Sequence, residues 1–565
     1  MAIELSNLTF TEQDDIVPAS GVEIILNTGI VNTLAGNDII IGTAESNYSL
    51  SIFNSGILYT GDGNDIIMGI PDPNKPFWSS GGIGTINGVI DTGDGNDMIT
   101  GIHTAHNGIT ISTSTIDTSD GNDTITGTAG RNLGDESGID IYYSGRLDTG
   151  KGEDIITGTG SFGIENHGSF NTGDNNDIIT GNAISINGIA DYTIGIFSIG
   201  EFYTGNGDDI ITGTNSSIGD YGIYIQGFMD TDNGDDKITA TAGDIGILNN
   251  GIIDTGDGRD TITSSSNIGI YNNSVSNIDT GDDNDIITST GVLYNEGVIE
   301  TGNGDDSIIS KGRLANRGVV FLGEGNDSII ADTNPPDRTF ENFNFITSTG
   351  VLYNEGVIET GNGDDSIISK GRLANRGVVF LGEGNDSITA DTNPPDRTFE
   401  NFNFIGTGDG NDTITSTGVL YNEGVIETGN GDDSIIVDGG VDENGTRYGI
   451  YNKGGAINTG NGNDSIIANE GFESAPNSSG AWFLGEGDDY IKGFGSGDFY
   501  GGNGNDTLEL TPGTYTFGIW GEGGESPIFT KGNQLMITSE FEKLKVGNTF
   551  YDFTNLTAGQ IITVA

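Results

Sequence analysis

The chain has 565 residues, 96 of them glycine, and a formal net charge of −63 at pH 7. Nucleic acid is excluded as a partner, because its binding requires a basic patch and the 20 Lys and Arg residues are scattered among 83 Asp and Glu. No apolar run is long enough to span a membrane, the first residues do not form a Sec-type signal peptide, and without cysteine no disulfide can form. Only 33% of the residues are hydrophobic, which in an acidic chain is typical of disorder unless those residues recur periodically.

A six-residue phrase recurs nineteen times and supplies this periodicity. It is Thr-Gly-(Asp/Asn)-Gly-(Asn/Asp)-Asp, as at residues 60–65, 92–97 and 459–464. We number its positions 1 to 6 and name position 6 the closing Asp. A phrase repeated at such intervals predicts a solenoid rather than a globular domain. The closing Asp residues are Asp38, Asp65, Asp97, Asp123, Asp154, Asp177, Asp209, Asp236, Asp260, Asp285, Asp306, Asp327, Asp365, Asp386, Asp412, Asp433, Asp464, Asp489 and Asp506.

Apolar residues flank the phrase at fixed offsets. Two residues after the closing Asp stands Ile in eighteen copies and Leu508 in the last, and seven residues before it the residue is always apolar, as Leu58 and Ile90 are. Fixed offsets indicate that every copy is one coil of the same shape, and the short runs rich in Ile, Val and Thr predict strands. For residues 268–290 the pattern predicts strand, turn, strand, phrase and strand. We therefore expect an all-β parallel β-helix or β-roll solenoid of about nineteen coils.

The intervals between successive closing Asp residues vary from 17 to 38, and the longer ones hold insertions that we expect to loop out at one corner. Residues 289–346 return as residues 348–405 with a single substitution, Ile330 to Thr389, which suits a fold that grows by whole coils. We expect three segments: an N-terminal cap at 1–20, the repeats at 21–510, and a small β-rich C-terminal cap at 511–565.

The phrase contains the residues that a calcium loop needs. Calcium prefers about six to eight hard oxygen ligands from carboxylates and backbone carbonyls. Glycine at positions 2 and 4 permits positive φ, so that carbonyls can point at one centre, and the closing Asp supplies a charged ligand. Without a cation, carboxylates ~4.8 Å apart would repel by roughly 1–4 kcal/mol per neighbouring pair, so we expect metal binding and folding to be one event.

The predicted metal ligands are all nineteen closing Asp residues together with acids at position 3 and glycines at positions 2 and 4. The position-3 acids are Asp62, Asp94, Asp120, Asp174, Asp257, Asp282 and Asp409. The glycines are Gly61, Gly63, Gly93, Gly95, Gly205, Gly207, Gly302, Gly304, Gly361, Gly363, Gly429, Gly431, Gly460 and Gly462. Several loops look impaired as ion sites, because they carry Ala35, Lys151, Glu153, Asn175, Arg259 or Asp283 in place of the usual residue. The alternative is that the phrases are plain β-turns, and nineteen copies in register disfavour it.

The phrase resembles the calcium-binding nonapeptide of the repeats-in-toxin (RTX), or hemolysin-type, family, Gly-Gly-x-Gly-x-Asp-x-apolar-x, with Thr usually in the first place. The resemblance covers about residues 30–510. It implies that Asp65 and its equivalents bind calcium through carboxylates, that Gly61 and Gly63 offer carbonyls, and that successive coils share each ion. It also implies type I secretion through an uncleaved C-terminal signal and folding on extracellular calcium. One departure is clear: two family nonapeptides complete a turn of about 18 residues, whereas here one phrase occurs per longer coil. We therefore expect a wider, triangular β-helix with a single calcium row.

No catalytic motif is recognisable. The chain has three histidines, and the pair His103 and His106 is spaced for a helix although its segment is typical of β-structure or a turn, which disfavours zinc. Metalloprotease and nucleophile-elbow motifs are absent from the sequence. We expect a non-enzymatic, secreted or cell-surface calcium-binding protein, such as an adhesin or cell-coat component with polysaccharide or its own copies as partners. The alternative is a secreted β-helix enzyme that degrades or modifies polysaccharide, for which Phe77 and Trp78 are the best candidate sugar platform.

Overall fold

The computed structural model describes residues 2–18, 23–44, 50–72, 81–130, 136–184, 192–216, 220–332, 351–391, 397–441, 446–475, 480–521 and 526–565. The chain forms two compact units, Met1–Gly291 with Glu296–Glu300 and Val292–Asn295 with Thr301–Ala565. In the described part of the chain both units consist of β-strands with two short 3-10 helices, η1 (Leu5–Asn7) and η2 (Phe553–Asn555). Phe77 and Trp78 lie outside the described residues.

Among these described segments, no helix has the length and apolarity needed to cross a membrane.

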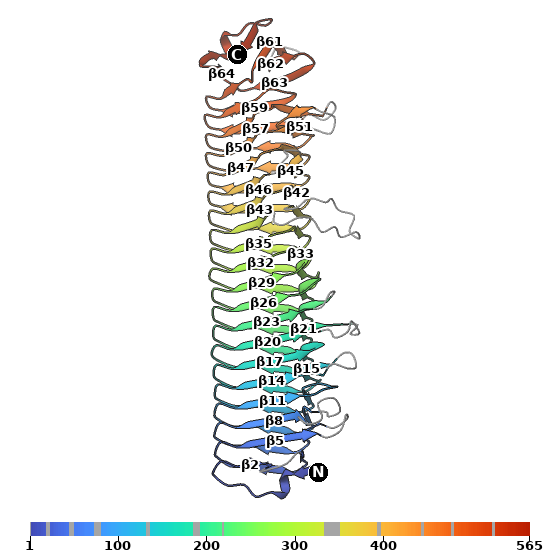
Figure 1. Ribbon diagram of the computed structural model, residues 1–565. Coiled ribbons are helices and arrows are strands. Elements are labelled where there is room, and N and C mark those ends of the chain that lie inside the picture. Colours follow the sequence, from blue (N-terminus) through green and yellow to red (C-terminus); the bar gives the residue numbers. More distant parts are fainter. Residues whose placement is uncertain are drawn as a thin grey trace. The chain divides into compact units, whose positions relative to one another are not determined.

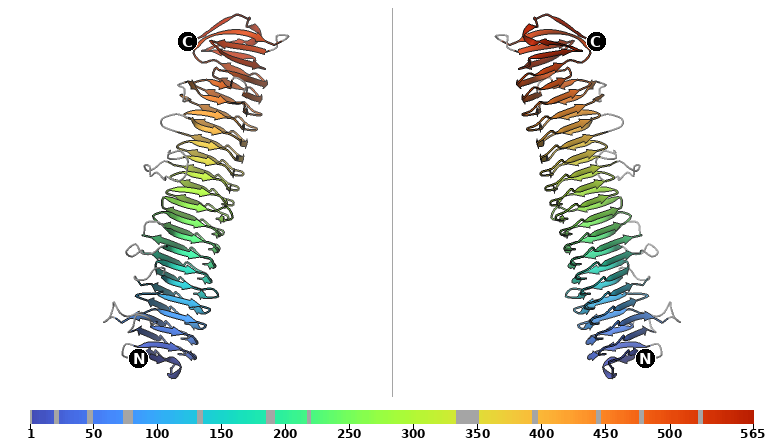
Figure 2. Two further views of the ribbon diagram at one scale, coloured as in Figure 1. Left: turned by 90° about the vertical axis from the view of Figure 1, so that its right-hand side faces the viewer. Right: turned by 90° about the vertical axis from the view of Figure 1, so that its left-hand side faces the viewer.

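Each coil contributes three short strands. In the first unit one coil comprises β9 (Ile83–Ile86), β10 (Val89–Asp91), the six-residue phrase and β11 (Met98–Ile102). These strands pair in parallel with β12 (Ile109–Ser112), β13 (Thr115–Asp117) and β14 (Thr124–Thr128) of the next coil. Each unit therefore has three parallel sheets, and we name them sheet 1 (with β9), sheet 2 (with β10) and sheet 3 (with β11). The stacked strands can be followed in Figure 1 and, from two sides, in Figure 2.

The predicted strands of residues 268–290 are confirmed. They are β30 (Ile268–Asn272), β31 (Asn277–Asp279) and β32 (Ile286–Ser289), with the phrase between the last two. The predicted triangular cross-section is also present, because three parallel sheets run through each unit. The phrase lies between sheet 2 and sheet 3 in every coil, so each unit has a single row of loops.

The core is made of apolar columns, one on each sheet. Leu58 and Ile90 stand on neighbouring strands of sheet 2, Ile67 and Ile99 on sheet 3, and all four are fully buried. Ile52 and Ile83 are paired neighbours in the third column, on sheet 1, and are also buried. Because each Ile packs on its equivalent one coil away, no coil buries its own apolar surface, and stability comes from stacking.

The second unit repeats the coil and ends in antiparallel structure. A typical coil is β42 (Leu373–Asn375), β43 (Val378–Glu383) and β44 (Ser387–Ala390). After β59 (Gly497–Asn503) and β60 (Thr507–Glu509), strands β63 (Gln534–Ser539) and β64 (Lys543–Val546) add to sheets 2 and 3 in parallel. Strands β61 (Gly513–Trp520), β62 (Ser526–Lys531), β65 (Thr549–Asp552) and β66 (Ile561–Val564) complete this end of the unit in antiparallel pairs.

The N-terminal residues of the first unit form a partial coil. Strand β1 (Ala2–Glu4) pairs in parallel with β3 (Ile24–Asn27), and β2 (Ile16–Val17) pairs with β5 (Ile39–Ala44). The backbone N–H of Asp15 donates a 2.8 Å hydrogen bond to Oδ1 of Asp38, as a closing Asp does. Residues 11–15 thus replace a loop phrase that the sequence does not contain there.

Candidate metal centre

The loop phrase has one backbone shape along each unit. Positions 2 and 4 have positive φ, for example 89° at Gly61 and 153° at Gly63. The shape survives where glycine is missing, because Leu34 (81°) at position 2 and Asn175 (94°) and Asp283 (90°) at position 4 also have positive φ. These loops, which look impaired in sequence, therefore keep the backbone conformation at some strain.

A second reason for glycine is the close stacking of successive loops. A Cβ on Gly93 would lie 2.3 Å from the carbonyl oxygen of Gly61, and one on Gly95 would lie 1.6 Å from that of Gly63. The position-2 and position-4 carbonyls of one coil therefore point at the glycines of the next. Within the described part of the chain, the carbonyl oxygens of these four glycines accept no hydrogen bond. They form a row of backbone oxygens that leaves little room for a Cβ at positions 2 and 4, although Leu34, Asn175 and Asp283 occupy such positions.

The closing Asp residues form one buried column in each unit. All nineteen are at most 2% exposed. The backbone N–H of seventeen of them donates to Oδ1 of the next, for instance Asp97 to Asp123 at 2.7 Å in the first unit and Asp433 to Asp464 at 2.8 Å in the second. This bond fixes the side-chain orientation in these coils, so the closing Asp residues are brought together as the phrase predicts.

The other oxygen of these carboxylates is left without a partner. Oδ2 is buried and accepts no hydrogen bond in seventeen of the closing Asp residues. They are Asp38, Asp65, Asp97, Asp123, Asp154, Asp177, Asp209, Asp236, Asp260, Asp327, Asp365, Asp386, Asp412, Asp433, Asp464, Asp489 and Asp506. A buried carboxylate oxygen without a donor is unfavourable by about 1–3 kcal/mol or more, so the column lacks a compensating positive charge.

The pKa values of the closing Asp residues agree with a column of carboxylates that lacks hydrogen-bond donors and positive charge. Burial raises the pKa of Asp65 to about 6, of Asp97 to about 7 and of Asp123 to about 8. Neighbouring carboxylates of the column add to the increase, since Asp154 and Asp97 both raise the pKa of Asp123. A cation would reverse this balance, because an opposite charge favours the ionised form.

An outer ladder of Asn and Asp at position 5 supports the loops from the solvent side. The backbone N–H of Asn64 donates to Oδ1 of Asn37 at 2.8 Å, and that of Asn96 donates to Oδ1 of Asn64 at 2.7 Å. Glu153 and Arg259 still donate through their backbone to the preceding coil. Their side chains therefore leave the loop backbone in place.

The position-3 acids are at a different place from the closing Asp residues. Six of the seven predicted ligands at position 3 are exposed, and Asp174 is half-exposed. Lys151, also at position 3, contacts Asp174 of the next coil with Nζ 2.9 Å from Oδ2. The structure thus separates an inner column, the closing Asp residues, from an outer one at position 3. The exposed acids are Asp62, Asp94, Asp120, Asp257, Asp282 and Asp409.

The donor set fits a hard cation. Orphaned carboxylate oxygens and glycine carbonyls that accept no hydrogen bond, as at Gly61 and Gly93, are the ligand types that calcium prefers. In the second unit, the carbonyls of Gly429 and Gly460 instead accept the backbone N–H groups of Asn461 at 3.0 Å and Glu486 at 2.9 Å. No three His, Asp or Glu side chains converge on one point among the described residues. This agrees with a loop that offers one buried carboxylate per coil and takes its other oxygens from the backbone. Cys and His ligands, which zinc prefers, are absent from the loop phrases.

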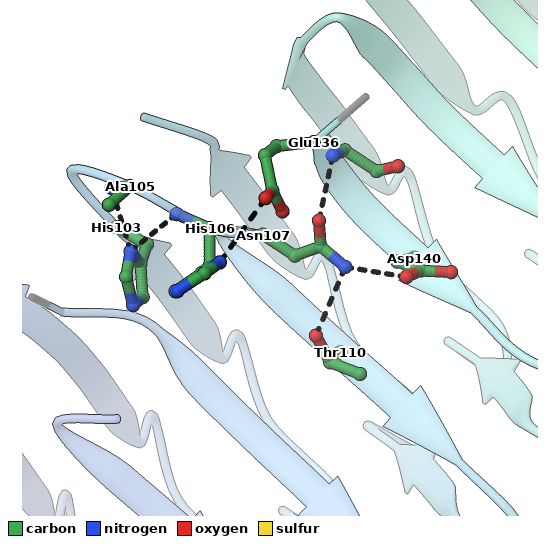
Figure 3. Close-up of polar contacts among 8 residues, drawn as sticks. His103, Ala105, His106, Asn107, Thr110, Glu136 and Asp140 are labelled. Carbon is green, nitrogen blue, oxygen red and sulfur yellow. Dashed lines mark hydrogen bonds and ion pairs between the residues drawn. The ribbon is translucent and has the colours of Figure 1, made fainter. Parts of the chain in front are cut away.

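The histidine pair has a structural role. Nδ1 of His103 accepts hydrogen bonds from the backbone N–H groups of Ala105 at 2.9 Å and His106 at 2.7 Å (Figure 3). Burial, followed by the nearby His106, lowers the pKa of His103 to about 4. His103 is therefore neutral, and its Nδ1 holds a turn.

The sequence shows no coil with a distinctive side-chain cluster away from the loop row, but the structure contains one on sheet 1. Asn107 donates to Oδ2 of Asp140 at 2.5 Å, and Nδ1 of His106 lies 3.2 Å from Oε1 of Glu136 (Figure 3). Asp140, on β15 (Ser137–Ile141), is in register with Glu165 on β18 (Phe162–Asn166). Burial, then the charge of Glu165, raises the pKa of Asp140 to about 8.

Aromatic rings adjoin this sheet-1 cluster. The ring of His167 stacks at 6.4 Å on Tyr142 and meets Tyr143 edge-on at 5.3 Å and Phe197 at 5.6 Å. Nε2 of His167 lies 2.9 Å from Oε1 of Glu165, which joins the rings to the carboxyl groups. Tyr143 is 65% exposed. The residues come from separate coils, so the sequence signal for this cluster is weak.

No protein-family model matches the chain. No curated protein matches it. Among solved structures, the chain is similar to a hyperactive, Ca2+-dependent, β-helical antifreeze protein from an Antarctic bacterium. The two are 16% identical, the match covers 81% of this chain and 84% of that chain, and the TM-score is 0.25. At this TM-score the two backbones do not superpose as whole chains, so nothing about function follows from the likeness.

Proposed function

We propose that the protein is a calcium-binding β-solenoid of the RTX, or hemolysin-type, class, with a structural and non-catalytic role outside the cell. The observation that supports this most strongly is the buried column of closing Asp residues with orphaned Oδ2 atoms. The seventeen closing Asp residues whose buried Oδ2 has no partner among the described residues would strongly oppose folding, and a row of divalent cations at the loops would offset that opposition.

The chain's own residues have separate roles in this proposal. The closing Asp holds Oδ1 in the ladder and offers Oδ2, as at Asp97. Glycines at positions 2 and 4, such as Gly93 and Gly95, offer carbonyls and keep the loops close together. When bound, calcium supplies positive charge and accepts several oxygen ligands at once. The position-3 acids are exposed, and we assign them to the outer side of each site.

Folding on calcium explains why the proposed location is extracellular. Loops that use backbone carbonyls and few carboxylates are typical of weak calcium sites, which fill at extracellular calcium concentrations. The resemblance of the phrase to the RTX nonapeptide supports type I secretion with a signal in residues 511–565 and an adhesin or cell-coat role. As an adhesin or cell-coat component, the protein would bind polysaccharide or other copies of its own chain.

Direct binding measurements test this proposal. Equilibrium dialysis of the full chain, first stripped with chelator, should show uptake of many calcium ions per chain and little magnesium. The variant Asp123→Asn should lose about one ion, whereas Asp552→Asn, an exposed control at the C-terminal end, should lose none. Uptake of no ions, or equal uptake of magnesium, would remove the proposal.

A second candidate function, a polysaccharide-modifying enzyme, is favoured by the sheet-1 cluster. Two carboxyl groups in adjacent strands, Asp140 and Glu165, lie beside exposed aromatic rings, a combination that suits sugars. Glu165 is the more accessible, since its side chain is 19% exposed and Asp140 is 2% exposed. Incubation with neutral and acidic polysaccharides should release reducing ends from at least one, and Glu165→Gln should abolish the release. No release from any of them would exclude this candidate.

A further inference from the structure

The last loop phrase of the second unit differs from the others at position 1. Residues 501–506 carry Gly501 where most loops have Thr. In a typical loop the hydroxyl of the position-1 Thr donates to the carbonyl of the position-1 residue in the next coil. Thr459, for example, donates at 2.9 Å to the carbonyl of Leu484, which takes the place of Thr in the next coil. Gly501 has no such group, so the space beside Asp506 is free for other atoms.

Glu542 occupies the place where the next closing Asp would stand. The backbone N–H of Asp506 donates to Oε2 of Glu542 at 2.8 Å, which matches the 2.9 Å bond from Asp489 to Oδ1 of Asp506. The N–H of Lys543 donates to the Asp506 carbonyl at 2.9 Å, as residues after each closing Asp do in the regular coils. Leu544 is paired with Leu508 and is fully buried. Residues 540–544 therefore imitate the second half of a loop phrase and the residues after it, without its glycines.

Oxygen atoms gather at the point left by the missing Thr side chain. A Cβ on Gly501 would lie 2.0 Å from the carbonyl oxygen of Glu540 and 2.7 Å from Oδ2 of Asp506. Oδ2 of Asp506 is buried and has no hydrogen-bond partner, and the residue is 0% exposed. Glu540 has a positive φ of 62°, a backbone conformation that is held by glycine in most of the loops. The chain thus holds a strained residue at the point where its carbonyl comes close to the last loop.

The opposite end of the repeats shows that such an arrangement is not needed merely to finish a column. In the first unit Oδ2 of Asp15 accepts the backbone N–H of Thr11 at 2.8 Å. Its carboxylate is therefore satisfied within the chain. Asp506 has no comparable donor for Oδ2.

We propose that Asp506, the Glu540 carbonyl and Glu542 form a terminal calcium site that fastens strands β63 and β64 to the last coil. The site joins the closing Asp of the last phrase to two residues outside the repeats, and it makes docking of the C-terminal strands dependent on calcium. The inference rests on the proposed function, because it assumes that the loops bind calcium. Its chemistry is that of the other loops, with a Glu carboxylate in the place of the next Asp.

Hydrogen–deuterium exchange of the full chain during a calcium titration tests the site. Two regions are compared: residues 534–546, which contain β63 and β64, and residues 413–437 in the middle of the second unit. In Glu542→Gln the calcium concentration that half-protects 534–546 should rise about tenfold or more, whereas 413–437 should keep the wild-type midpoint. Asp552→Asn, an exposed carboxylate on the neighbouring strand, is the matched control and should leave both midpoints unchanged. Glu542→Asp, which keeps the charge on a shorter side chain, should give an intermediate shift at 534–546.

The other possible results of the exchange experiment would overturn either the terminal site or the proposed function. An unchanged midpoint at 534–546 in Glu542→Gln would overturn the terminal site, and so would an equal shift of both regions, since it would show a global loss of stability. If neither region of the wild-type chain responds to calcium, the proposed function itself fails, and that result is distinct from the first two.

Discussion

The backbone N–H of Asp65 donates a 2.7 Å hydrogen bond to Oδ1 of Asp97, 32 residues further along the chain. The bond takes one carboxylate oxygen of Asp97 and leaves the other, Oδ2, buried without a donor. A ladder of this kind aligns the coils, but it also accumulates desolvated negative charge along one row. The proposed calcium dependence follows from these two opposing effects: the hydrogen bonds hold the coils in register, and the buried negative charges destabilise the same row unless a cation neutralises them.

Removing one charge from the column should therefore have opposite effects with and without calcium. Asp123→Asn removes a carboxyl group whose pKa burial raises to about 8. We expect the variant to be more stable than wild type in chelator and less stable in millimolar calcium, by about 1–3 kcal/mol each way. Urea unfolding in both buffers measures this. Asp552→Asn, which removes an exposed carboxylate outside the loop phrases, serves as the control. Equal destabilisation in both buffers would show that Asp123 is only a hydrogen-bonding residue.

Loop stacking should be sensitive to a single methyl group. Gly95→Ala would place its Cβ 1.6 Å from the Gly63 carbonyl at a φ of 150°, so the coils must separate locally. We expect a loss of more than about 2 kcal/mol, seen as a lower melting temperature. Gly532→Ala has positive φ (63°) but no atom within 4 Å of its Cβ, so it isolates the backbone strain, about 1 kcal/mol. Similar losses in the two variants would contradict the stacking argument.

Asp140 should make the first unit less stable at alkaline pH. Its pKa is raised in the folded state to about 8, by burial first and then by Glu165. Between about pH 4 and 8 the unfolded chain releases this proton more readily than the folded one, so stability falls as pH rises through that range. Asp140→Asn should therefore gain at least about 1 kcal/mol over wild type at pH 8 and much less at pH 4.5. Urea unfolding at constant calcium measures the difference. A gain that does not change with pH would rule out ionisation as its cause.

A buried ladder of Asn residues should contribute as much to the free energy of unfolding as an apolar core residue does. Nδ2 of Asn375 donates to Oδ1 of Asn401 at 2.9 Å and to the Phe404 carbonyl at 2.9 Å, and the residue is 0% exposed. Asn375→Ala leaves these partners unsatisfied and should lower the free energy of unfolding by about 1–3 kcal/mol. Chemical denaturation measures it, with the exposed Asn469→Ala as control. Equal stability of the two variants would show that the ladder is dispensable.

Sequence reasoning identified two of the three core columns because the loop has constant length. Leu58 and Ile67 stand at fixed offsets from Asp65, and both are buried. The third column, with Ile83 and Ile139, is not among the predicted positions, although its residue stands thirteen to fifteen residues before the following closing Asp in most coils. Insertions between sheet 3 and sheet 1 vary only its distance from the preceding closing Asp. The Asn ladder had a detectable signal, since Asn354, Asn375 and Asn401 all stand eleven residues before a closing Asp.

The parts of the candidate site that escaped sequence reasoning depend on contacts between coils. The phrase predicted a buried closing Asp but not that Asp65 would donate to Asp97, which is a property of stacking. Glu542 carries no motif, because its segment lacks the glycines of the phrase and reaches the same conformation through a strained Glu540. The pairing of Asp140 with Glu165 follows from the lengths of two unrelated coils. Only the register in three dimensions shows these relationships.

The central claim is that calcium and folding are one event, and far-UV circular dichroism during a calcium titration of chelator-treated protein tests it most directly. We expect β-sheet signal to appear cooperatively between micromolar and millimolar calcium, with magnesium unable to replace it. A chain that is equally folded in chelator would contradict the account, and the loop phrases would then be plain turns.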